Sequence, residues 1–309
     1  MEKVFNRCEI HYLKRIQACP GLYFAAGSWN IEGTIINGTG VGESKYEAAA
    51  RCRAERAESL ALYRSAGYLG ISAMSDYSTY GSAAASSFSL ALQRAENEAL
   101  EHYAVYRWWF GHHPPALPTP GILQHVQRKH TDWRRSSHRK FQILELPTDM
   151  HRSVYVAWSV NFEGSEFLIG ASCCANPRHA AEAALKELIQ MECGLEIVHF
   201  RRSAGVRLCA EEISILSRAE GLNMAECKCL LRPASRQQNY SYRFDRTSTD
   251  HVDQFQKTGN LVLRQAELPE VDDHYKIAFV SLRSDPPTQG FIDNKLDSVR
   301  FPWQNWSPY

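Results

Sequence analysis

The feature that most constrains this chain is a helical pattern of charged residues that occurs twice. In each copy an arginine is followed by a glutamate four residues later and by a second glutamate three residues after that. The two copies are Arg51-Glu55-Glu58 and Arg94-Glu98-Glu101. On an α-helix these offsets place all three side chains on one face, with neighbouring Cβ atoms roughly 5–6 Å apart. We therefore predict two helices, each with one acidic face.

Both copies lie in alanine-rich segments, Tyr46–Ala61 and Leu90–Tyr106. One such pair of glutamates is usually a solvated helix face, but repetition with arginine at the same offset favours a shared site. If the two helices pack side by side, four carboxylates meet. Two like charges about 4 Å apart repel by roughly 4 kcal/mol at an effective dielectric constant near 20, so such a cluster predicts a bound cation.

A third alanine-rich helix is predicted over Arg178–Glu192, after Asn176-Pro177, because proline fits the first turn of a helix. This helix carries Glu187 and Gln190 at the same spacing of three residues.

Strands are predicted before the helices. The segments Gly21–Ala26 and Ile31–Ile36 carry aromatic and β-branched residues around the predicted turn Gly27–Asn30. The stretch Asn37–Gly42 reads as a glycine-rich loop that opens into the first helix, where a phosphate could bind at the helix N-terminus.

The remainder continues the mixture of strands and helices. Predicted strands are Phe141–Leu146, Val154–Phe162, Glu166–Cys173, Leu195–Phe200, Tyr240–Phe244, Asn260–Leu263 and Tyr275–Leu282, with a helix over Val206–Arg218. A proline-rich loop is predicted over 111–121. The expected fold class is α+β, with mixed or antiparallel sheets packed against the alanine-rich helices.

Composition excludes several classes of protein. The formal net charge of +1 creates no global field that would recruit nucleic acid or an anionic membrane. The first residues lack the apolar core of a secretory signal, and no segment approaches the roughly 20 apolar residues of a membrane span. We therefore expect a cytoplasmic protein with no membrane partner. The nine cysteines show no C-x-x-C spacing, which argues against zinc sites and disulfides.

Taken in order, the three motifs resemble the YcaO family of ATP-utilising enzymes. Gly38-Thr39-Gly40 and Ala48–Glu58 are similar to the family's glycine motif and A-x-x-E-x-x-E helix, Ala91–His102 is similar to its second acidic helix, and Ala184–Gln190 to its A-L-x-E-x-x-Q helix. The expected organisation is one YcaO-like domain over 1–309, in which the part from 200 to 309 matches only loosely.

The resemblance implies a site for Mg²⁺ and ATP. Glu55, Glu58, Glu98 and Glu101 match glutamates that ligate magnesium in the family, and the positions of Arg51, Arg94, Glu187 and Gln190 match neighbours of the nucleotide. Hard oxygen ligands suit magnesium, and nucleotide phosphates complete its octahedral shell.

The resemblance also implies a reaction and partners. The expected activity is ATP-dependent phosphorylation of backbone amides in a ribosomally made precursor peptide, which yields azolines by cyclodehydration or thioamides with external sulfide. A separate protein is expected to bind the leader peptide or deliver the nucleophile, and homodimers would be compatible with the family. No catalytic residue is nominated on the protein itself.

Departures from the family pattern leave two alternatives. Thr39 stands where lysine is usual, Ser59 and His102 replace arginines, and Ala183 stands where an arginine commonly precedes the third motif. A non-catalytic scaffold or peptide-binding subunit is therefore one alternative. A nucleic-acid binder that uses the basic segment Gln124–Lys140 is the other.

Overall fold

We describe the fold from a computed structural model of the chain. The described residues are 9–15, 19–31, 34–69, 78–109, 114–134, 138–148, 152–222, 227, 231, 254–258, 261–268 and 275–284. The strand predicted at Tyr240–Phe244 lies outside these residues.

Ten strands form three antiparallel sheets in the described part of the chain. The first sheet has the order β1 (Glu9–Arg15), β2 (Tyr23–Ile31), β3 (Thr34–Gly42). The second has the order β4 (Ser78–Ala85), β10 (Lys276–Ser284), β9 (Leu261–Leu268), β8 (Gln254–Thr258), and the third β5 (Arg139–Leu146), β6 (Ser153–Asn161), β7 (Leu168–Cys174). Strands β4 and β10 pair although they lie far apart in the sequence, so the N-terminal and C-terminal halves of the chain share one sheet.

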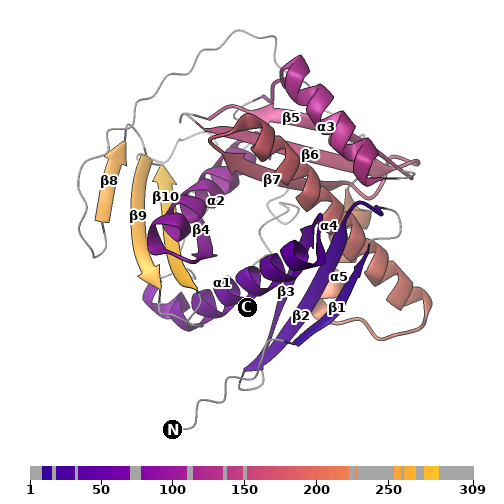
Figure 1. The fold of residues 1–309 in the computed structure, drawn as a ribbon, viewed down its shortest axis with the longest axis horizontal. Helices are drawn as coiled ribbons and strands as arrows, with labels where there is room; N and C mark the ends of the chain where they lie inside the picture. The colour runs from indigo at the N-terminus through magenta and orange to yellow at the C-terminus, as the bar shows by residue number, and fades with distance from the viewer. Residues whose placement is uncertain are drawn as a thin grey trace.

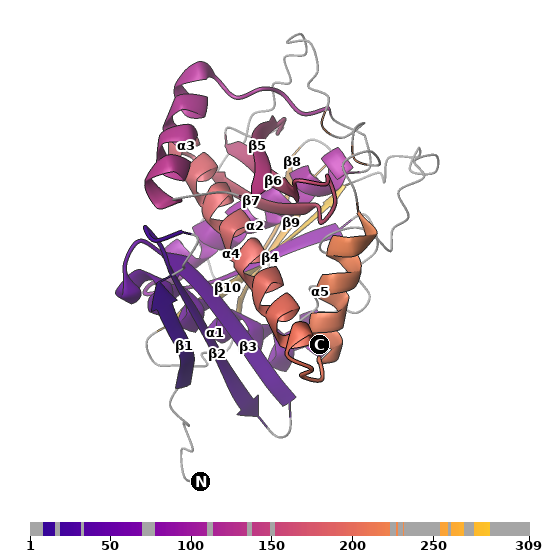
Figure 2. The ribbon, with the colours of Figure 1, turned by 90° about the vertical axis from the view of Figure 1, so that its right-hand side faces the viewer.

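The three motif-bearing helices each follow a strand. They are α1 (Lys45–Leu69) after β3, α2 (Phe88–Trp109) after β4 and α4 (Pro177–Ser203) after β7. Two further helices, α3 (Pro120–Trp133) and α5 (Ala210–Gly221), pack against α4. The three sheets are spaced around the molecule, and α1, α2 and α4 lie on their inner sides (Figure 1). Turned by 90°, the molecule shows α5 running beside the C-terminal part of α4 (Figure 2). The predicted α+β class, with antiparallel sheets packed against alanine-rich helices, is confirmed.

Alanine on these helices permits close packing against the sheets. On α2 the buried residues Ala91, Ala95 and Ala99 recur every four positions and face β4 and β10. Trp108 and Trp109, both almost fully buried, fill the space between the end of α2 and the β5–β7 sheet. A small residue on the contact face lets a helix approach a sheet closely, while the aromatic residues bury large apolar areas. This close packing fixes the distance between each helix and its sheet, and so fixes the positions of the polar residues on the helix.

Two predictions near the N-terminus are wrong. Gly27–Asn30 lies inside β2 and is no turn, and Asn37–Gly42 is the second half of β3 and no loop. The glycines of that segment serve close packing instead of a turn. A Cβ on Gly40 would lie 2.4 Å from the backbone oxygen of Ala48, so only glycine admits α1 so close to the strand.

A third prediction is wrong near the end of α4, where Leu195–Phe200 is helical and no strand. The apolar run that suggested a strand also has helical spacing, since Leu195 and Val198 are buried together against Leu216 and Ala219 of α5. Packing between two helices has therefore overridden the strand propensity of the segment. The predicted 111–121 loop is also shorter than expected, because α3 begins at Pro120.

No helix among the described residues is long and apolar enough to cross a bilayer.

Candidate functional site

Three helices bring the predicted acidic residues close together. Glu98 on α2 interacts electrostatically with Glu55 on α1 and with Glu187 on α4. Glu58 and Glu101 join the same group, because Glu58 is repelled by Glu98 and Glu55, and Glu101 by Glu187 and Glu98. The structure therefore gathers five carboxylates from three helices that are distant in the sequence.

The first glutamate of each motif is fixed by a backbone N–H of the preceding strand. The N–H of Thr39 donates to Glu55 Oε2 at 2.9 Å, that of Ser82 to Glu98 Oε2 at 3.0 Å, and that of Ala171 to Glu187 Oε2 at 2.9 Å. Donor and acceptor are 16 positions apart in all three cases. The pairs β3–α1, β4–α2 and β7–α4 are thus copies of one local unit, each of which presents an oriented carboxylate.

A glycine immediately before each donor makes this contact possible. A Cβ on Gly38, Gly81 or Gly170 would lie 2.5, 2.2 or 2.1 Å from a backbone atom of the following helix. Such distances exclude any side chain, so the helix can approach the strand only at glycine. The glutamate seventeen positions after each glycine then reaches the strand N–H.

The second polar residue of each motif forms a hydrogen bond with the strand of another strand–helix unit. Glu58 Oε1 on α1 accepts the N–H of Ala84 on β4 at 2.7 Å, and Glu101 on α2 accepts the N–H of Cys173 on β7. On α4, Gln190 Nε2 donates to the Thr39 hydroxyl on β3 at 2.7 Å. These contacts therefore join the three units in a closed ring.

Burial and mutual repulsion set the electrostatics of the acidic cluster. Burial first and neighbouring carboxylates second raise the pKa of Glu98 and of Glu187 to about 8, and raise the pKa of Glu58 and Glu101 well above 4.5. The Glu98 side chain nevertheless keeps 36% of its surface exposed, so a ligand can reach it. Protonation or a bound cation relieves the repulsion within such a group.

The two predicted arginines occupy different surroundings. Arg94 Nη1 donates to the backbone oxygen of Ala84 at 3.4 Å, and its charge acts to lower the pKa of Glu58. Arg51 instead pairs with Glu47 at 3.2 Å, and about half of its side chain is exposed. Arg94 thus lies beside the carboxylates, while Arg51 is directed to the first turn of α1.

The sequence placed Thr39 in a loop and did not predict the contacts that Thr39 and His102 make at the site. Thr39 is central, because its hydroxyl donates to Glu55 Oε2 at 3.1 Å while accepting the Gln190 amide. His102, next to Glu101, places Nδ1 2.6 Å from the backbone oxygen of Tyr80. A signal for the strand residues was present, since a glycine stands seventeen positions before the first glutamate of each motif.

The donor set suits magnesium held together with phosphates. Among the residues that the structure describes, no group of three or more His, Cys, Asp or Glu side chains forms a metal cage by itself. Magnesium differs from metals that need such cages, because it usually binds one or two carboxylates and takes its remaining ligands from water and substrate phosphates. Carboxylates from the three helices would supply that kind of partial coordination.

Comparison with known families decides the relationship. The family model described as YcaO cyclodehydratase, ATP- and Mg²⁺-binding, matches residues 58–267, about two thirds of the chain. This chain belongs to the YcaO family. The match begins at the second glutamate of the first motif and includes both glutamates of the second and the Glu187–Gln190 pair. ATP and Mg²⁺ are accordingly the cofactors of this YcaO protein.

Solved structures share the YcaO fold at low sequence identity. YcaO from Methanopyrus kandleri bound with AMPPCP and Mg²⁺ is 11% identical, with a TM-score of 0.51 over 91% of this chain and 86% of that chain. A heterocyclase in complex with substrate and cofactor is 12% identical, with a TM-score of 0.57 over 89% of this chain, which spans half of the heterocyclase. The E. coli microcin synthetase McbBCD complex is 10% identical, with a TM-score of 0.50 over 88% of this chain and 86% of that one. No curated protein matched the sequence.

Proposed function

We propose that this YcaO protein uses ATP and Mg²⁺ to phosphorylate backbone amide oxygens in a ribosomally made precursor peptide, and so forms azoline rings. The observation that carries the proposal is the cluster of five carboxylates from three helices. In each motif, a backbone N–H of the preceding strand holds the first glutamate in place. Phosphoryl transfer depends on positioning and charge neutralisation more than on covalent help from the protein. An arrangement of fixed acidic side chains meets that requirement.

The residues divide into two proposed roles. Glu55, Glu58, Glu98 and Glu101 would hold Mg²⁺ through carboxylate oxygens. Arg51, Arg94, Glu187 and Gln190 would lie next to the nucleotide, with Arg94 the better placed of the two arginines. When bound, magnesium neutralises phosphate charge and orients the nucleotide for in-line transfer.

The reaction consumes one ATP for each ring. A Cys, Ser or Thr side chain of the peptide adds through its S or O to the preceding amide carbon, and loses its proton. The former carbonyl oxygen takes the γ-phosphoryl group of ATP, which releases ADP. Loss of phosphate and of the amide proton then leaves a C=N bond in the five-membered azoline. The protein contributes binding, orientation and exclusion of water, and no side chain forms a covalent bond with the substrate.

Partners follow from the same proposal. A related heterocyclase was solved with a substrate, and the E. coli microcin synthetase is an assembly of subunits. We propose that this protein likewise acts on a precursor peptide together with a separate protein that binds the leader peptide or delivers the nucleophile. Association of two copies of this chain would be compatible with it.

Binding of AMPPCP and Mg²⁺ by the isolated chain tests the site. Calorimetry should detect Mg²⁺-dependent binding of AMPPCP by the wild type, and Glu98→Gln should weaken it by at least about tenfold, because a carboxylate ligand is lost. A matched control is Glu163→Gln, which changes a carboxylate in an exposed turn between β6 and β7. Absence of Mg²⁺-dependent binding by the wild type would contradict the proposal and favour a non-catalytic scaffold.

The product is tested with the precursor peptide and partner. Azoline formation lowers the peptide mass by one water per ring, whereas thioamide formation replaces oxygen by sulfur and needs added sulfide. A sulfide-dependent gain in mass would replace the azoline proposal by the thioamide one.

A further inference from the structure

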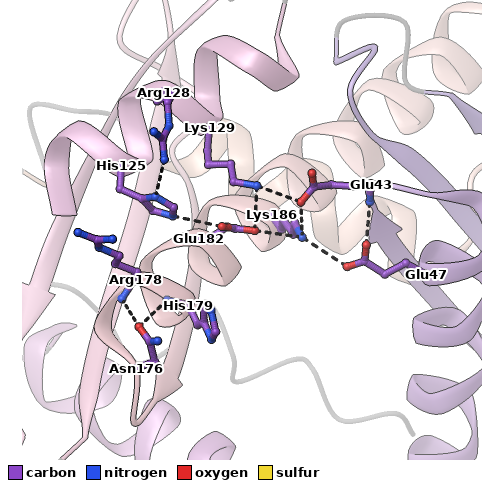
Figure 3. A network of polar contacts seen from close by, with 10 residues as sticks. All are labelled: Glu43, Glu47, His125, Arg128, Lys129, Asn176, Arg178, His179, Glu182 and Lys186. Carbon is purple, nitrogen blue, oxygen red and sulfur yellow. Dashed lines mark hydrogen bonds and ion pairs between the residues drawn. The ribbon is translucent and has the colours of Figure 1, made fainter. Parts of the chain in front are cut away.

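A cluster of ion pairs lies beside the site, where the start of α1 meets α3 and α4 (Figure 3). Lys186 on α4 stands at its centre. Its Nζ lies 3.3 Å from Glu43 Oε1, 3.4 Å from Glu47 Oε1 and 3.4 Å from Glu182 Oε1. The Lys186 side chain is only 9% exposed. An ammonium so deeply buried is tolerated because carboxylates surround it, and these contacts fix its position.

Lys129 on α3 provides a natural comparison within the same cluster. Its Nζ lies 3.2 Å from Glu43 Oε1 and 3.6 Å from Glu182 Oε1, two of the carboxylates that Lys186 also contacts. Both ammonium groups lie 5.3 Å from the centroid of the Trp133 ring. Only Lys186, however, lies on α4 and also reaches the first turn of α1.

Lys186 and Gln190 are one helical turn apart on α4 and contact the same strand–helix unit. Lys186 pairs with Glu43, which directly follows β3, and Gln190 donates to Thr39 within β3. Side chains four residues apart share a helix face, so α4 is joined to this unit at two successive points. Without Lys186, the neutral hydrogen bond from Gln190 to Thr39, worth only about 1 kcal/mol, would remain to hold α4 against β3 next to the site.

We propose that Lys186 is a positioning residue of the nucleotide site. Its ion pairs hold β3 and the start of α1 against α4, and this contact keeps Thr39 and Glu55 in place for the metal and nucleotide. The effect on nucleotide binding rests on the proposed function, but the effect on the geometry of β3 does not. Lys186 acts through these residues and does not itself contact the nucleotide.

The charge states support this role. Burial alone would raise the pKa of Glu43 and of Glu47, but other contacts outweigh it. Hydrogen bonds and the charges of Lys129 and Lys186 lower the pKa of Glu43 below 4.5, and the backbone N–H of Glu43 with the charges of Lys186 and Arg51 lowers that of Glu47. Glu43 and Glu47 therefore stay ionised at neutral pH, and their contacts with Lys186 persist under the conditions in which the site would work.

Lys186→Met and the matched control Lys129→Met test the proposal. Lys186→Met should weaken binding of AMPPCP with Mg²⁺ about tenfold, and should accelerate hydrogen exchange of the Thr39 amide in the metal-free protein by about the same factor. Lys129→Met should change both quantities by less than about twofold, although it removes partners from the same two carboxylates. Lys186→Arg should restore most of the binding, because it retains the charge.

Four outcomes would overturn the positioning role or distinguish it from the proposed function. Equal effects of the two methionine variants, or an unchanged Thr39 amide in Lys186→Met, would overturn the positioning role. If Lys186→Met does not fold, Glu47→Gln tests the same link from its more exposed end, and an unchanged Thr39 amide there would also overturn it. If the wild type binds no AMPPCP, the proposed function fails, whereas the exchange of the Thr39 amide still decides the role of Lys186.

Discussion

The side-chain amide of Gln190 donates to the hydroxyl of Thr39 at 2.7 Å, across 151 positions of the sequence. The same hydroxyl donates to Glu55, so one threonine links the third motif to the first. This contact closes the ring of three strand–helix units. It also explains why residue 190 is a glutamine. A carboxylate there would add another negative charge beside Glu55 and could not donate to Thr39.

Removal of the Thr39 hydroxyl should weaken the site without unfolding it. Thr39→Val keeps the backbone N–H that binds Glu55 but deprives Gln190 and Glu55 of their shared partner, so we expect AMPPCP and Mg²⁺ to bind about tenfold more weakly. Thr39→Ser retains the hydroxyl and should bind within about threefold of the wild type. Calorimetry measures both, and equal affinities of the two variants would refute a role for the hydroxyl.

Gly81→Ala should destabilise the protein strongly. The added Cβ would lie 2.2 Å from the backbone oxygen of Ala95, which would force β4 and α2 apart. We expect the free energy of unfolding to fall by about 1–3 kcal/mol. Gly194→Ala is the control, because a Cβ there meets nothing within 4 Å and alanine favours a helix by about 1 kcal/mol. Urea denaturation measures both changes, and similar stabilities of the two variants would contradict the close approach.

Arg94→Ala should weaken nucleotide binding more than Arg51→Ala. Arg94 lies by the acidic cluster, whereas Arg51 pairs with Glu47 at 3.2 Å. We expect a loss on the order of tenfold for Arg94→Ala and of about threefold or less for Arg51→Ala, because an exposed ion pair contributes little. Titration with AMPPCP at fixed Mg²⁺ concentration gives both values. Unchanged affinity in both variants would remove the arginines from the nucleotide site.

Alkaline pH should destabilise the metal-free protein. Burial and neighbouring carboxylates raise the pKa of Glu98 and Glu187 to about 8 in the folded state, above the ordinary 4.5. The folded state then binds more protons than the unfolded state between these values, so the favourable contribution is complete below 4.5 and is lost as pH rises through about 8. Thermal melts in EDTA from pH 6 to 9 should therefore show a falling Tm.

Glu98→Gln provides the control for this pH dependence. Glutamine cannot ionise, so the fall in Tm between pH 6 and 9 should become shallower, and the variant should be more stable than the wild type at pH 9. Mg²⁺ with AMPPCP should stabilise the wild type increasingly as pH rises, since ionised carboxylates bind cations better. Identical pH profiles for the wild type and Glu98→Gln would contradict the raised pKa of Glu98.

The sequence by itself determined the three acidic helices, most of the strands and the family resemblance. Helical spacing places Glu55 with Glu58 and Glu98 with Glu101 on one face regardless of what packs around them, so these pairs could be predicted from local periodicity. The membership of the YcaO family predicted from these motifs is confirmed by the family model. The same local reading failed at Leu195–Phe200, where contact with α5 selected helix over strand.

Only the tertiary structure decided how the helices face one another and which strand atoms hold them. Gly38 was predicted to lie in a loop, yet Gly38, Gly81 and Gly170 all lie in strands where a following helix leaves no room for a Cβ. The contact of Gln190 with Thr39 and the pairing of Lys186 with Glu43 join distant segments. Periodicity describes one element at a time, whereas such contacts depend on the packing of several elements, and for that reason they emerged only from the folded chain.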